Sequence, residues 1–112
     1  MEKDIKIIES HILRCRPGDW EHAKRVVRWV KELGQEREDL PLLITAGYIH
    51  DIGWRDLLKK EKITFEELLE LEPKANENSE PYIRELLKQL NYKNNDIETI
   101  LRLVSSSDKH KS

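Results

Sequence analysis

The chain has 112 residues, which is room for one hydrophobic core, so we expect a single domain over residues 1–112. Its 20 basic and 22 acidic residues give a net charge of −2, which argues against a polybasic surface for bulk nucleic acid or for a membrane. One cysteine, a charged N-terminus and no apolar run of about 20 residues favour a soluble cytoplasmic protein without disulfides or membrane spans.

The spacing of apolar residues is helical along nearly the whole chain, and no segment shows convincing strand alternation. We therefore predict an all-α fold, a compact bundle of about six to seven helices. A first helix is predicted over about residues 2–14, ending before the helix-breaking stretch RPGD. A second is predicted over about residues 20–33, with Asp19 as its N-cap. Its expected core face consists of His22, Val26, Trp29, Val30 and Leu33.

The rest of the chain carries shorter helical segments. A third helix is predicted to begin near Leu40 and to end at Gly53, and an irregular helical turn is expected over residues 55–60. The stretch TFEE is a capping box for a further helix, which Pro73 is expected to end. Two more helices are predicted, with Ser79 and Asn95 as their N-caps, and the polar tail SSSDKHKS is expected to fray.

Two histidines and one aspartate stand out because they lie at predicted helix ends. His22 is in the first turn of the second helix, and His50 and Asp51 follow the apolar part of the third. If these helices are antiparallel and joined by a short linker, the start of one lies beside the end of the other. Imidazole nitrogens and carboxylate oxygens are ligands of manganese, iron, cobalt, nickel and zinc ions. The three side chains are therefore a candidate metal site.

The stretches DWEHAKRVVRWVKEL and LPLLITAGYIHDIGW resemble the HD superfamily of metal-dependent phosphohydrolases. The resemblance implies that His22, His50 and Asp51 are metal ligands and that a late aspartate is the fourth. Asp108 is the late candidate, although it lies in a polar segment and not in an apolar helix. Members with two metals carry further histidines that this chain lacks, so one divalent ion is expected. Family chains commonly continue further, so we also expect a chain that is truncated or lacks the last aspartate ligand.

The same resemblance implies hydrolysis of a small phosphate ester, nucleotide-like in size. Asp51 is the expected catalytic residue, holding the metal and orienting water, and either Asp56 or Glu61 could act as a separate base. Arg25 and Arg55 are candidate phosphate contacts, because a guanidinium matches phosphate oxygens in pairs. The alternative for both arginines is a surface ion pair.

Two other functions are compatible with the sequence. A degenerate HD domain would bind metal or nucleotide as a sensor or scaffold without turnover, and the missing fourth ligand favours it. A helical interaction module would need the match at His22, His50 and Asp51 to be a coincidence. The sequence also leaves open whether the domain forms a homodimer.

Overall fold

The computed structural model describes residues 2–59 and 62–109, and within these ranges the chain forms five α-helices, one short 3₁₀ helix and no strand. The predicted all-α fold is therefore confirmed, whereas the expected count of six to seven helices is wrong. The elements are α1 (Glu2–Ile12), α2 (Asp19–Leu33), α3 (Leu40–Ile49), η1 (Ile52–Trp54), α4 (Phe65–Gln89) and α5 (Asn94–Lys109).

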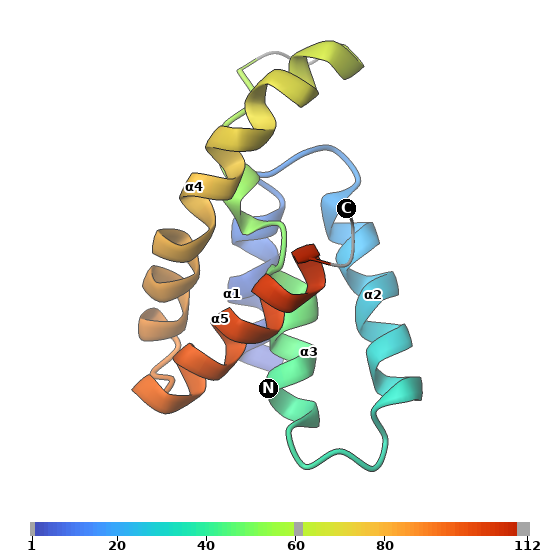
Figure 1. The fold of residues 1–112 in the computed structure, drawn as a ribbon, viewed down its shortest axis with the longest axis vertical. Helices are drawn as coiled ribbons and strands as arrows, with labels where there is room; N and C mark the ends of the chain where they lie inside the picture. Colours follow the sequence, from blue (N-terminus) through green and yellow to red (C-terminus); the bar gives the residue numbers. More distant parts are fainter. Residues whose placement is uncertain (1, 60–61, 110–112) are drawn as a thin grey trace.

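The helices α2 and α3 form an antiparallel hairpin with α5 lying across α3, and the long α4 runs along the side of the molecule opposite α2, where it packs against η1 and α5 (Figure 1). Gly47 of α3 allows the close approach in this hairpin, since a Cβ added there would lie 3.2 Å from Cγ2 of Val27 on α2. The core is built from side chains of every α-helix. Its fully buried members are Ile12, Ile49, Ile52, Ile83, Leu86, Leu87, Ile97 and Ile100.

The helix α4 replaces two predicted helices with one of 25 residues. Its capping box is confirmed, because the Thr64 hydroxyl accepts from the Glu67 N–H and the Glu67 carboxylate accepts from the Thr64 N–H. The helix continues through Pro73, where we expected an interruption, and also through Pro81. A proline removes one helical hydrogen bond and crowds the carbonyl four residues earlier. Both prolines lie on the exposed side of α4, where water can reach those carbonyls.

Smaller differences concern the ends of the elements. The third helix ends at Ile49 and Gly53 belongs to η1, while residues 55–57 form a turn and not a helix. The N-cap of α2 is Gly18 in a left-handed conformation, and Asp19 is the first helical residue. The last helix extends through Lys109, so part of the tail that we expected to fray is helical.

The core face of α2 also differs from the prediction. Its buried residues are Asp19, Trp20, Ala23 and Val27. Trp29 and Leu33, both expected in the core, are 63% and 80% exposed. The helix has apolar residues on more than one side, and the hairpin with α3 covers the side around Val27.

In the part of the chain that the structure describes, no helix combines the length and the apolar character needed to cross a membrane.

Candidate metal centre

The fold brings together the three side chains that the sequence singled out. His22 lies in the first turn of α2, His50 is the C-cap of α3, and Asp51 is the N-cap of η1. One ligand atom from each residue can be chosen so that all three atoms lie within 4.8 Å of one another. The two imidazole rings meet edge to face, with their centroids 5.3 Å apart. The hairpin of α2 and α3 thus places the start of one helix beside the end of the other.

Backbone contacts set the orientation of the His50 ring. Its Nδ1 lies 2.7 Å from the carbonyl oxygen of Gly47, and since a carbonyl can only accept, Nδ1 must carry the proton. In the neutral ring the lone pair is then on Nε2, which faces Oδ2 of Asp51 at 3.0 Å. A lone pair and a carboxylate oxygen repel each other at this distance unless a positive charge lies between them. Either a proton on Nε2 or a metal ion satisfies this arrangement.

The donor set fits a first-row divalent ion. Two ligands bound to one ion at about 2.1 Å are at most about 4.2 Å apart, so small side-chain rotations are enough to bring the three donors onto one ion. The bond from His50 to the Gly47 carbonyl is the kind of outer contact that orients metal-binding histidines. His22, His50 and Asp51 could therefore hold a metal together.

The surroundings of His22 keep its ring neutral. Partial burial lowers the pKa of His22, and the neighbouring His50 lowers it further. A histidine must be unprotonated to bind a metal, so the lowered pKa leaves the His22 lone pair available at neutral pH.

His22 and Asp51 lie on the wall of a cavity of about 700 Å³. The polar residues that line it are Arg16, Asp19, His22, Asp51, Glu72 and Asn76. The other lining residues are Pro17, Trp54, Leu58, Ile63, Phe65, Leu68 and Leu69. The cavity therefore joins the candidate metal ligands to an apolar wall that comes largely from the start of α4 and the segment before it.

A comparison with protein families matches the HD domain over residues 19–112 of the chain. The chain belongs to the HD domain family. Proteins of this family are typically metal-dependent phosphohydrolases. The matched range contains the three candidate ligands and the whole hairpin that carries them. Neither the curated proteins nor the solved structures that were searched gave a significant match.

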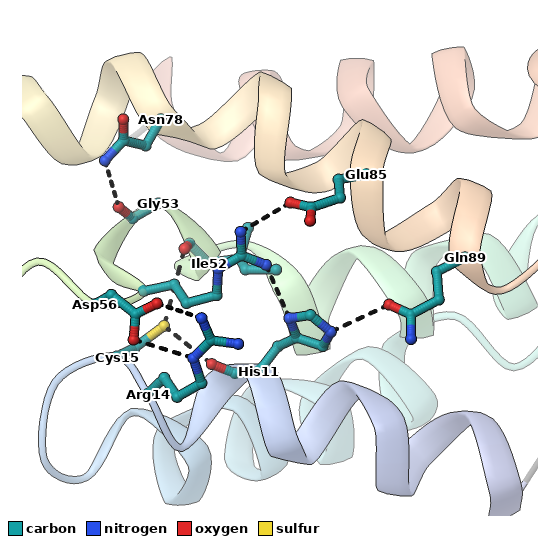
Figure 2. A network of polar contacts seen from close by, with 10 residues as sticks. His11, Arg14, Cys15, Ile52, Gly53, Asp56, Asn78, Glu85 and Gln89 are labelled. Carbon is teal, nitrogen blue, oxygen red and sulfur yellow. Dashed lines mark hydrogen bonds and ion pairs between the residues drawn. The ribbon is translucent and has the colours of Figure 1, made fainter.

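In this HD domain, the partners of Arg55 are residues other than the candidate metal ligands His22, His50 and Asp51. Arg55 is 8% exposed, and its guanidinium donates to Oε2 of Glu85 at 2.8 Å and lies 2.9 Å from Nδ1 of His11. Its Cζ lies 4.0 Å from the centroid of the Tyr82 ring. Figure 2 shows the surrounding network, which joins His11 on α1 to Glu85 and Gln89 on α4. The expectation that Arg55 contacts a phosphate has no support in this geometry.

The remaining expected residues are placed as follows. Arg25 is exposed on α2 and does not line the cavity. Asp56 pairs with Arg14, which holds the pKa of Asp56 below its usual value and makes it a weaker base. Glu61 lies outside the described residues. Asp108 falls within α5, but its side chain lies outside the described part of the chain, so its role as a fourth ligand stays a prediction.

Sequence reasoning missed four polar residues of the cavity: Arg16, Asp19, Glu72 and Asn76. Asp19 was interpreted as a helix cap, but its carboxylate accepts from the backbone N–H of Arg16 at 3.0 Å. A signal existed for this pair, because Arg16 lies just before the helical turn that carries His22 and Asp19 begins that turn. No local signal pointed to Glu72 and Asn76, which reach the cavity only through the packing of α4.

Proposed function

We propose that this HD domain hydrolyses a small phosphate ester with one divalent transition metal held by His22, His50 and Asp51. The observation that carries the proposal is the grouping of these three donors, two of which, His22 and Asp51, lie on the wall of a cavity. Family membership supports the reaction class.

The proposed roles of the individual residues are as follows. The bound ion supplies a Lewis acid for phosphoryl oxygens and for water. The Gly47 carbonyl fixes the His50 ring, so that its Nε2 faces Asp51 and would be the atom that holds the ion. Asp51 would help to hold the ion and would orient the attacking water. Glu72, a carboxylate on the cavity wall, is the proposed acceptor of the proton from that water, since Asp56 is already paired with Arg14.

The cavity offers both polar and apolar surface to a substrate. Its volume of about 700 Å³ is within the usual range for small-molecule sites, roughly 300–1,000 Å³. Its wall includes the candidate metal ligands His22 and Asp51, while Trp54, Phe65 and Leu69 provide aromatic and aliphatic surface. A phosphate ester of an apolar or planar alcohol, nucleotide-like in size, matches both kinds of surface.

A binding domain without turnover is the second candidate. Within the described residues, three donors and not four gather at the centre. A weaker metal site could still serve as a sensor of metal or nucleotide.

The test is phosphate release from a panel of nucleoside mono-, di- and triphosphates in the presence of manganese, cobalt or nickel. We expect release by the wild-type chain and a loss of about 100-fold or more in His50→Ala, as is typical when a metal ligand or its support is removed. Metal binding without release from any substrate would favour the binding domain. Equal release by wild type and His50→Ala would contradict the proposed centre.

A further inference from the structure

We infer that Arg16 is the phosphate contact of this centre, an inference that rests on the proposed function. Arg16 lies in the loop before α2 and lines the same cavity as His22 and Asp51. Its Nη2 lies 3.2 Å from Oδ2 of Asp51, the same oxygen that faces Nε2 of His50. A guanidinium is therefore in direct contact with one of the candidate metal ligands.

The position of the Arg16 side chain is fixed from two sides. Its Nε donates to Oδ2 of Asp19 at 2.9 Å, and its backbone N–H donates to the same oxygen at 3.0 Å. Its Cζ lies 4.4 Å from the centroid of the Trp54 ring, so the guanidinium also has a cation–π contact with an aromatic wall. An arginine held in this way loses little conformational entropy when it binds a ligand.

The charges around Arg16 favour an anion once a metal is present. In the structure, the Asp51 carboxylate faces both the Arg16 guanidinium and the His50 ring. A divalent ion that shares this carboxylate draws its negative charge and leaves the Arg16 guanidinium less neutralised. Because Nε is bound to Asp19 and Nη2 already contacts Asp51 with one N–H, the N–H groups of Nη1 and the second N–H of Nη2 are the part of the fork that is offered to a ligand. Two parallel N–H donors beside a divalent cation match the oxygens of a phosphate.

The other arginines near the centre fit this role less well. Arg25 is exposed and does not line the cavity, and Arg55 is bound to Glu85 and His11. The competing explanation for Arg16 is purely structural, namely that it neutralises Asp19 and Asp51. A structural role predicts that its loss lowers stability or metal affinity. A phosphate contact predicts that its loss lowers phosphate affinity while both of these are retained.

The experiment is calorimetric titration of inorganic phosphate into the cobalt-loaded chain. We compare wild type with Arg16→Gln, Arg16→Lys and the exposed control Arg28→Gln, and measure cobalt affinity and thermal unfolding of each. Arg16→Gln is expected to weaken phosphate binding by about 10-fold or more, the usual size for a charged hydrogen-bond pair. Arg16→Lys should recover part of this loss because it keeps the charge but not the fork. Arg28→Gln should bind phosphate like wild type.

Each outcome decides the inference. If Arg16→Gln binds cobalt and phosphate as tightly as wild type, Arg16 is not the contact, and the proposed function is unaffected. If Arg16→Gln unfolds or loses cobalt, the phosphate affinity of Arg16→Lys is the deciding measurement. An Arg16→Lys protein that binds phosphate as tightly as wild type would also overturn the inference. If wild type binds no cobalt, the proposed function fails. Titration of phosphate into metal-free wild type and metal-free Arg16→Gln then decides separately whether Arg16 binds the anion.

Discussion

His11 is held in a form that only the neutral ring can adopt. Its Nδ1 lies 2.9 Å from Nη1 of Arg55, which can only donate, so Nδ1 must accept. Its Nε2 then carries the proton and donates to Oε1 of Gln89 at 3.3 Å (Figure 2). Burial, followed by the charge of Arg55, lowers the pKa of His11 below its ordinary value, and the nearby Glu85 only partly opposes this. The network joins α1 to α4 and the turn after η1.

This network predicts a pH dependence of stability. The unfolded chain binds a proton at His11 near pH 6.5, whereas the folded chain resists it until a lower pH, so the unfolded state carries more bound protons. The free energy of unfolding should therefore fall as the pH is lowered from 7 to 5. Urea denaturation at both pH values should show a smaller fall in His11→Gln than in wild type. Equal falls in the two proteins would show that the His11 network does not contribute.

At the residue scale, the sequence predicted that His22, His50 and Asp51 lie at helix ends, and the structure has them there. The apolar pattern indicates the helices, whereas the antiparallel pairing that brings the three together was a condition of the prediction. Arg16 was not predicted because its partners Asp19 and Asp51 come together only through the fold. Trp29 was assigned to the core because it is apolar and at helical spacing, but the pattern does not say which apolar side a neighbouring helix covers.

At the level of elements, the contact between η1 and α4 positions the turn that begins at Asp51, one of the three candidate metal ligands. A Cβ added to Gly53 would lie 2.0 Å from the carbonyl oxygen of Ala75, so the two backbones touch at this point. The Asn78 amide donates to the Gly53 carbonyl at 3.3 Å, as Figure 2 shows. The long helix α4 thus packs directly against the turn that follows Asp51.

We expect Gly53→Ala to destabilise the protein by about 1–3 kcal/mol or more, because the obstacle is backbone and cannot rotate away. Gly47→Ala is the matched comparison, since the nearest atom there is a Val27 methyl at 3.2 Å. It should cost less than Gly53→Ala in thermal or urea unfolding. A Gly53→Ala protein as stable as wild type would show that α4 does not pack against η1 in this way.

The same contact explains why α4 was not predicted as one helix. Pro73 was interpreted as the end of one helix and Ser79 as the start of the next, and local sequence carries no information about the surface against which a helix packs. Ala75, between the two prolines, is buried against η1, while Ile83, Leu86 and Leu87 are buried in the core. Burial at both ends of the segment favours continuity despite the two prolines.

For the molecule as a whole, the fold class follows from a helical apolar period along the chain, and family membership supports the same centre. The cavity was beyond sequence reasoning, because its wall combines the loop before α2, the turn after α3 and one side of α4. A metal at His22, His50 and Asp51 would bridge the α2–α3 hairpin and η1. It should therefore stabilise the folded chain, by about 2.7 kcal/mol when the free metal exceeds its dissociation constant a hundredfold.

In the proposed centre, α2, α3 and η1 together hold one divalent ion. The most direct measurement is the cobalt content of the purified chain after equilibrium dialysis at pH 7.5, where the lowered pKa of His22 leaves its ring neutral. We predict one cobalt per wild-type chain, and none in His22→Ala or His50→Ala, with the helix content by circular dichroism preserved. A wild-type chain without stoichiometric cobalt, or a folded His22→Ala chain that keeps its full complement, would contradict the account.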